Sequence, residues 1–106
     1  MLAWLSAFAF TQAIEAPIYR RAGAGWRVAL LASALTHPFV WFGFEQVQKL
    51  GLGYSATLVL VECFAIGVET LWLSAWGVKR AFYWSLLANL TSVTLGFLSR
   101  RLFGWP

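Results

Sequence analysis

Three glutamates stand in apolar stretches of this chain. Glu15 lies in the first stretch and Glu62 and Glu69 lie in the third, whereas the fourth acidic residue, Glu45, lies in a polar connection. A carboxylate in hydrocarbon costs several kcal/mol unless it is neutralised, paired or hydrated. The spacing of Glu62 and Glu69 places them on one face of a helix, within about 20° of each other and about 10 Å apart along its axis. These carboxyl groups are therefore candidates for holding a proton, a cation or a cationic substrate.

Two other apolar stretches supply polar groups that can meet these glutamates. The only histidine, His37, precedes Pro38, which leaves the carbonyl group of Ala34 without its usual hydrogen-bond partner. In the last stretch, Asn89 and Ser92 belong to a stripe of polar and small residues about 80° wide. Because an amide must be satisfied away from water, we expect these faces to converge on one polar pocket. The predicted substrate- or ion-binding residues are Glu62, Glu69, His37, Asn89, Glu15 and Ser92.

The composition predicts the elements that position these residues. Hydrophobic residues make up 60% of the 106 positions, charged residues only 11%, and the mean hydropathy is +0.70, which excludes an ordinary soluble domain. Charges and turn formers divide the chain into four segments, each near the roughly 20 residues that a helix needs to cross a bilayer. The short connections favour neighbouring antiparallel helices, so we predict an all-α integral membrane four-helix bundle, an up-down-up-down hairpin pair in one transmembrane domain. The predicted helices span residues 1–19, 26–44, 54–78 and 81–98.

Basic residues near the predicted helix ends indicate an orientation. Five lie on the side of the first and third connections, and three lie on the opposite side: Arg20, Arg21, Arg27, Lys79 and Arg80 against Lys49, Arg100 and Arg101. The larger number favours the first side as the cytoplasmic side of an inner membrane, with both termini non-cytoplasmic. This placement predicts contacts with anionic membrane lipids and no nucleic-acid partner.

No motif in the sequence identifies an enzyme class or a cofactor. The chain has no phosphate-binding loop, no nucleophile elbow and no repeat that would identify an enzyme class. The single Cys63 excludes an internal disulfide and a cysteine-based metal cluster. A zinc or iron site built from His37, Glu62 and Glu69 is a weak alternative, because one histidine is present. We therefore predict no metal and no cofactor.

In length, in having four helices and in carrying a glutamate in the first of them, the chain resembles the small multidrug resistance transporters. The segment Thr11–Pro17 departs from that family, whose glutamate occurs within a compact run of small residues. The resemblance is therefore one of architecture, and no site residue is carried over from it.

These observations predict a proton- or cation-coupled transporter or carrier module that acts as a homodimer or larger membrane assembly, with a small cation or small molecule as substrate. A noncatalytic accessory subunit of a larger membrane complex is the first alternative, and an intramembrane enzyme acting on a lipid-embedded substrate is the second. The polar residues also have a purely structural interpretation, a buried hydrogen-bonded cluster that fixes the helix register. For Glu15, a further alternative is pairing with Arg20 or Arg21 at the end of its helix.

Overall fold

The structure is a computed structural model that describes residues 2–106, and it confirms the predicted all-helical, four-helix architecture. Within these residues there is no β-strand. Met1, with which the first predicted helix begins, lies outside the described residues. The helices are α1 (Leu2–Arg21), α2 (Trp26–Gln48), α3 (Tyr54–Ala75) and α4 (Ala81–Phe103).

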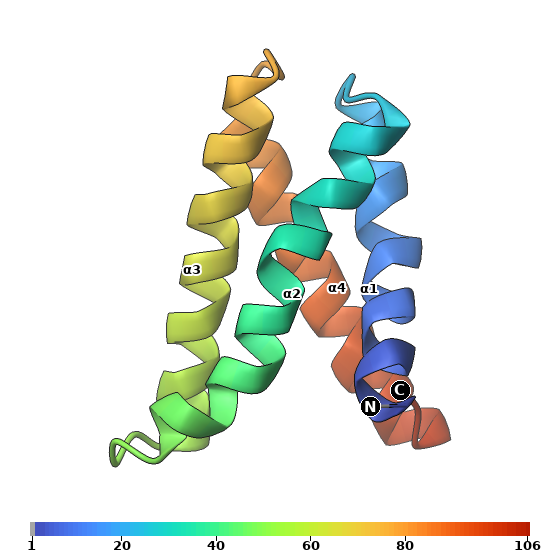
Figure 1. The fold of residues 1–106 in the computed structure, drawn as a ribbon. Helices are drawn as coiled ribbons and strands as arrows, with labels where there is room; N and C mark the ends of the chain where they lie inside the picture. Colours follow the sequence, from blue (N-terminus) through green and yellow to red (C-terminus); the bar gives the residue numbers. More distant parts are fainter. Residues whose placement is uncertain (1) are drawn as a thin grey trace.

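The four helices form a ring in which each helix packs against its two neighbours, in the order α1, α2, α3, α4. The connections 22–25 and 76–80 lie at one end of the bundle, and the connection 49–53 lies at the other end (Figure 1). Both chain termini lie at the end with connection 49–53 (Figure 1). We call the end with the connections 22–25 and 76–80 the connection end, and the end with both termini the terminus end.

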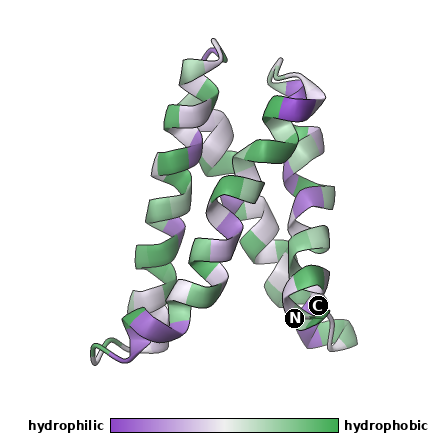
Figure 2. Ribbon diagram, viewed as in Figure 1, coloured by the Kyte–Doolittle hydropathy of each residue, from purple (hydrophilic) through white to green (hydrophobic). Residues whose placement is uncertain are grey.

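Three of the four helices, α2, α3 and α4, are long and apolar enough to cross a membrane, which fits a membrane protein. The helix α1 is not among them. In Figure 2 most turns carry the hydrophobic colour, and the hydrophilic colour gathers near helix ends and in a few turns between them. The helices therefore combine an apolar surface with a small number of polar positions.

Two of the predicted helix ends fall short of the observed ones by four or five residues. The second helix continues beyond residue 44 to Gln48, and Glu45, which we had placed in a connection, lies within it. There the Glu45 carboxylate forms an ion pair with Lys49 at 3.8 Å. The two residues are four apart in the sequence, the separation at which ion pairs stabilise a helix. The fourth helix continues beyond residue 98 to Phe103, and Gly104 ends it in the left-handed conformation with φ +68°. Polar residues at the edge of an apolar segment thus extend these helices.

The third helix is shorter than predicted, because it ends at Ala75 and not at residue 78. Gly77 adopts φ +79°, a left-handed conformation that glycine accepts without a steric penalty and that terminates a helix. The first helix ends in the same way: it continues to Arg21, and Gly23 follows with φ +105°. Local backbone geometry, and not the loss of hydrophobic residues, therefore sets both ends.

The buried core lies toward the connection end and consists mainly of alanine. Its largest members are Tyr19 and Leu73, both fully buried. The remaining members are Ala16, Ala24, Ala29, Ala32, Ala81 and Ala88. Small side chains let helix backbones approach closely, as in helix contacts within membranes. The connection end is therefore closed by packing.

Candidate functional site

Glu69 of α3 accepts hydrogen bonds from the other three helices, and only 1% of it is exposed. Its Oε2 accepts a hydrogen bond from the Thr36 hydroxyl at 2.6 Å. Its Oε1 accepts from the Tyr19 hydroxyl and from the Asn89 amide, the latter at 3.2 Å. These donors come from α2, α1 and α4, so this one carboxyl group ties all four helices together.

Glu15 of α1 forms a second buried centre and is 2% exposed. Its Oε1 accepts from the Ser33 hydroxyl of α2 at 2.6 Å, and its Oε2 accepts from the Ser92 hydroxyl of α4. The side chain therefore points into the bundle, and the alternative in which it pairs with Arg20 or Arg21 is wrong. Within residues 2–106 the one ion pair joins Glu45 and Lys49, far from this centre in the sequence.

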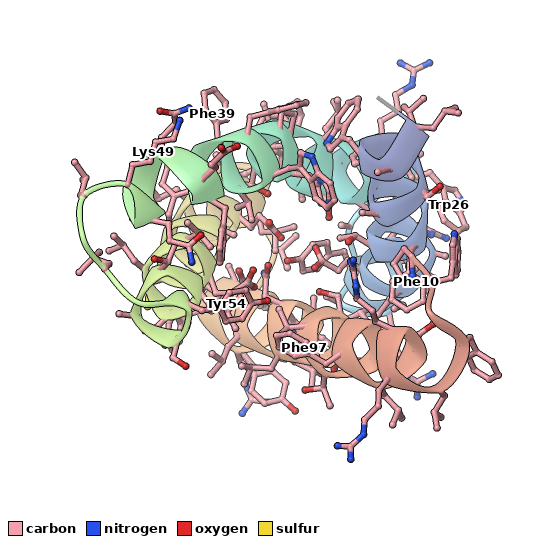
Figure 3. All side chains as sticks on the ribbon, turned by 90° about the horizontal axis from the view of Figure 1, so that it is seen from below. Phe10, Trp26, Phe39, Lys49, Tyr54 and Phe97 are labelled. Atoms are coloured by element: carbon pink, nitrogen blue, oxygen red, sulfur yellow. The ribbon has the colours of Figure 1, made fainter. Side chains whose placement is uncertain are left out.

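All six predicted binding residues line one cavity of about 220 Å³. The cavity begins among Glu15, Glu69 and their partners and extends toward the terminus end, where Tyr54 and Arg100 also line it. Figure 3 looks along the bundle from that end, and Tyr54, Phe10 and Phe97 lie around the central space. Because the alanine-rich core fills the opposite end, the cavity has the form of a cup.

Glu62 and His37 occupy the part of the cavity nearer the terminus end, and both are half-buried. His37 Nδ1 accepts a hydrogen bond from the indole N–H of Trp4 at 3.0 Å, so this nitrogen carries no proton. The imidazole also lies against the rings of Phe8 and Trp41, with centroids 5.4 and 6.3 Å away. Within the part of the chain that the structure describes, the Glu62 carboxyl group forms no hydrogen bond, so it borders the cavity unpaired.

The weak alternative of a metal held by His37, Glu62 and Glu69 is not supported. Among residues 2–106, no group of three or more histidine, cysteine, aspartate or glutamate side chains is placed to hold a metal ion. Glu69 is instead occupied by the neutral donors of three other helices.

Comparison with known proteins gives no relative. No family model, curated protein or solved structure matches this chain. Function is therefore inferred from the geometry of the cavity.

Three side chains that hold the carboxyl groups were missing from the prediction: Tyr19, Ser33 and Thr36. Tyr19 follows Glu15 by one helical turn, so the sequence places it on the same face of α1. Ser33 and Thr36 are three residues apart, the spacing that puts two hydroxyls side by side on α2. The signal was thus present, but single hydroxyls are common in membrane helices and mostly serve helix packing.

Proposed function

We propose that this chain is a membrane-embedded carrier module, coupled to protons or small cations, whose four helices cross an inner membrane as an antiparallel bundle. The observation that carries the proposal is that Glu15 and Glu69 are buried at one cavity and are bonded by neutral donors alone. A buried carboxyl group without a cationic partner is costly to keep charged, so binding a proton or a cation is favourable. A purely structural cluster needs no cavity beside it.

The exposed surface of α1 supports a fourth crossing, although its overall hydropathy is low. The buried Glu15 contributes to that low value without facing lipid. The exposed positions are apolar up to the last turn, where Arg20 and Arg21 end the helix. They are Leu2, Ala3, Leu5, Ala9, Ala13 and Pro17. A helix with an apolar outer face and an inward carboxyl group is suited to a bundle in lipid.

The proposed orientation has the connection end cytoplasmic and both termini outside, because arginine and lysine are more numerous at the connection end. In this orientation the cup faces the non-cytoplasmic side. A cup of about 220 Å³ in four helices does not cross the bilayer by itself. We therefore propose that the working unit is a homodimer or a larger assembly of this chain.

The test is ion flux into liposomes that contain the purified chain. Vesicles loaded with a pH-sensitive dye and energised by a potassium diffusion potential report proton entry, and radioactive sodium reports cation entry. We expect the wild-type chain to exceed protein-free vesicles in at least one assay. Glu15→Gln and Glu69→Gln should return that flux to the protein-free level, because the amide keeps the shape but binds no exchangeable proton.

The matched control is Glu45→Gln, which removes an exposed carboxyl group outside the cavity. It should retain wild-type flux. Failure of the wild-type chain to move either ion would contradict the carrier function. Obligate copurification with a larger complex would then favour the accessory subunit, and turnover of a membrane lipid would favour the enzyme.

A further inference from the structure

The two connections at the closed end of the bundle have the same backbone structure. Gly23 after α1 and Gly77 after α3 both adopt positive φ, +105° and +79°. In each connection, the residue after the glycine donates its N–H back to the residue four before the glycine, at 3.0 Å. These bonds run from Ala24 to Tyr19 and from Val78 to Leu73. A shift of 54 residues, which also takes Glu15 to Glu69, therefore relates α1 and its turn to α3 and its turn.

The helices that follow these turns match in their buried positions. A shift of 56 residues relates the buried positions of α2 to those of α4, since the second connection is one residue longer than the first and α4 begins one residue earlier in this register than α2 does. The buried residues of α2 are Ala29, Ala32, Ser33 and Thr36, and their counterparts Ser85, Ala88, Asn89 and Ser92 are buried in α4. Both helices contain 23 residues. The chain thus repeats a helical hairpin, first as α1 and α2 and then as α3 and α4.

The hydrogen bonds within the two hairpins correspond. In the first hairpin, Ser33 of α2 donates to Oε1 of Glu15 at 2.6 Å. In the second, its counterpart Asn89 of α4 donates to Oε1 of Glu69 at 3.2 Å. Each glutamate is therefore held by the same position of its own hairpin.

The bonds between the hairpins correspond as well. Ser92 of the second hairpin donates to Oε2 of Glu15, and its counterpart Thr36 of the first hairpin donates to Oε2 of Glu69. Exchange of this kind is what a two-fold axis along the bundle produces. The ring order agrees with that axis, because it exchanges α1 with α3 and α2 with α4.

Both cross-hairpin hydroxyls have a second acceptor. The Thr36 hydroxyl lies 3.3 Å from the carbonyl oxygen of Ser33, and the Ser92 hydroxyl lies 3.1 Å from the carbonyl oxygen of Asn89. These carbonyls are themselves at corresponding positions. A hydroxyl with two acceptors can donate to an ionised carboxylate, or rotate to its carbonyl and accept from a protonated one. Each half of the centre therefore satisfies both charge states of its glutamate.

We infer that the chain is a duplicated helical hairpin and that Glu15 and Glu69 are its two equivalent proton-binding sites, one in each repeat. A proton from water binds one carboxylate oxygen, the partner hydroxyl rotates to its carbonyl, and release reverses both steps. A larger ligand does not fit this geometry, because all four carboxyl oxygens already accept hydrogen bonds from protein donors. A metal or an ammonium group would have to displace those donors, whereas a proton needs only the rotation.

Other groups also influence these two sites, and Glu15 and Glu69 act on each other. The titratable or charged side chains from each helix that border the cavity or bond to the two glutamates are Tyr19, His37, Tyr54, Glu62 and Arg100. Their role in transport rests on the proposed function. Proton binding itself does not, because it can be measured on the purified chain without any flux.

The experiment is infrared titration of the full chain in detergent, following the C=O stretch of protonated carboxyl groups as the pH is changed. Glu62→Gln serves as the background, since it removes the third carboxyl group of the cavity. In that background, Glu15→Gln and Glu69→Gln should each remove one of two comparable bands, and the double variant should remove both. Glu45→Gln should leave both cavity bands in place. Two bands of which only one titrates, or none that titrates, would overturn the inference.

A second pair of variants keeps the proposal testable if a glutamate variant does not fold. Ser92→Ala should shift the titration of the Glu15 band more than that of the Glu69 band, and Thr36→Ala should do the opposite, because the two carboxyl groups also act on each other. Equal shifts of both bands by either variant would contradict two distinct sites with one partner hydroxyl each. Two titrating bands without ion flux would refute the carrier function and leave the two equivalent sites intact. Ion flux with a single titrating band would support the carrier function and refute the two equivalent sites.

Discussion

Replacing Glu69 by leucine tests whether its hydrogen bonds hold the bundle together. The variant removes the acceptor of three donors from three helices, Tyr19, Thr36 and Asn89. Thr36 and Asn89 each keep a backbone carbonyl acceptor, at 3.3 and 2.8 Å, so each loses about 0.6 kcal/mol, the average for such bonds in membranes. Tyr19 is fully buried and loses its acceptor, which costs about 1–3 kcal/mol. The expected loss in the free energy of unfolding is about 2–4 kcal/mol.

Glu69→Gln should lose less than about 1 kcal/mol. The carbonyl oxygen of the introduced amide still accepts hydrogen bonds from Tyr19 and Asn89. Its NH2 group donates to the Thr36 hydroxyl, which then donates to the carbonyl oxygen of Ser33. Unfolding by sodium dodecyl sulfate in mixed micelles, followed by near-ultraviolet circular dichroism, measures both variants. Glu62→Leu is the matched control on the same helix, because that carboxyl group forms no hydrogen bond to the described residues. Equal stability of Glu69→Leu and wild type would refute the network.

Three further outcomes follow from the geometry. Tyr19→Phe should destabilise the chain by about 0.5–1.5 kcal/mol in the same unfolding assay, because the phenol donates to Glu69. Gly77→Ala should lower the free energy of unfolding by about 1–2 kcal/mol, because an alanine is strained at this positive φ. Gly67→Ala should stabilise the chain, because Gly67 lies in mid-helix with open space around it. Thermal denaturation compares the two variants. A reporter fused after Pro106 should report a non-cytoplasmic carboxyl terminus, and a cytoplasmic signal would reverse the proposed orientation.

Helix number could be predicted from the sequence, and helix ends only in part. The starts at Trp26, Tyr54 and Ala81 coincide with the predicted ones, since a glycine or a basic residue marks each boundary. The ends did not follow hydropathy, because polar side chains such as Glu45 and Arg100 remain helical when solvent or lipid headgroups receive them. Charge therefore marks where an apolar segment ends and not where helical hydrogen bonding stops.

The convergence of the polar faces on one pocket was predictable, but the pairing inside it was not. Helical periodicity gives the face on which Glu69 or Asn89 lies, and the cost of burying them implies a common pocket. Which donor reaches which oxygen depends on the rotation and depth of each helix, which periodicity does not set. Asn89, for example, donates to Glu69, whereas Glu62 stands nearer the cavity mouth.

The repeat is hard to detect in the sequence because few of its side chains recur, and between α2 and α4 the identical residues are Leu30–Ala32 and Leu86–Ala88. Between α1 with its turn and α3 with its turn, the identical pairs are Phe10 and Phe64, Glu15 and Glu69, and Gly23 and Gly77. What recurs is a role: a small residue where helices touch, a donor where a carboxyl group needs one, a glycine where the turn requires positive φ. Several residue types fill each of the first two roles, so sequence identity decays while the geometry persists.

The positions that break the two-fold relation are informative for the same reason. The counterpart of Glu62 in the first hairpin is Phe8, and that of His37 in the second is Val93, so the polar groups at the cavity mouth occur once whereas the central glutamates occur twice. Matched positions must satisfy the same demand in both repeats, here the holding of a carboxyl group in either charge state. Unmatched positions are free to differ, and a site that selects what enters from one side needs to be built only once. The cavity therefore divides into a duplicated centre and a single mouth, and we expect the selectivity of the proposed carrier to depend on the mouth.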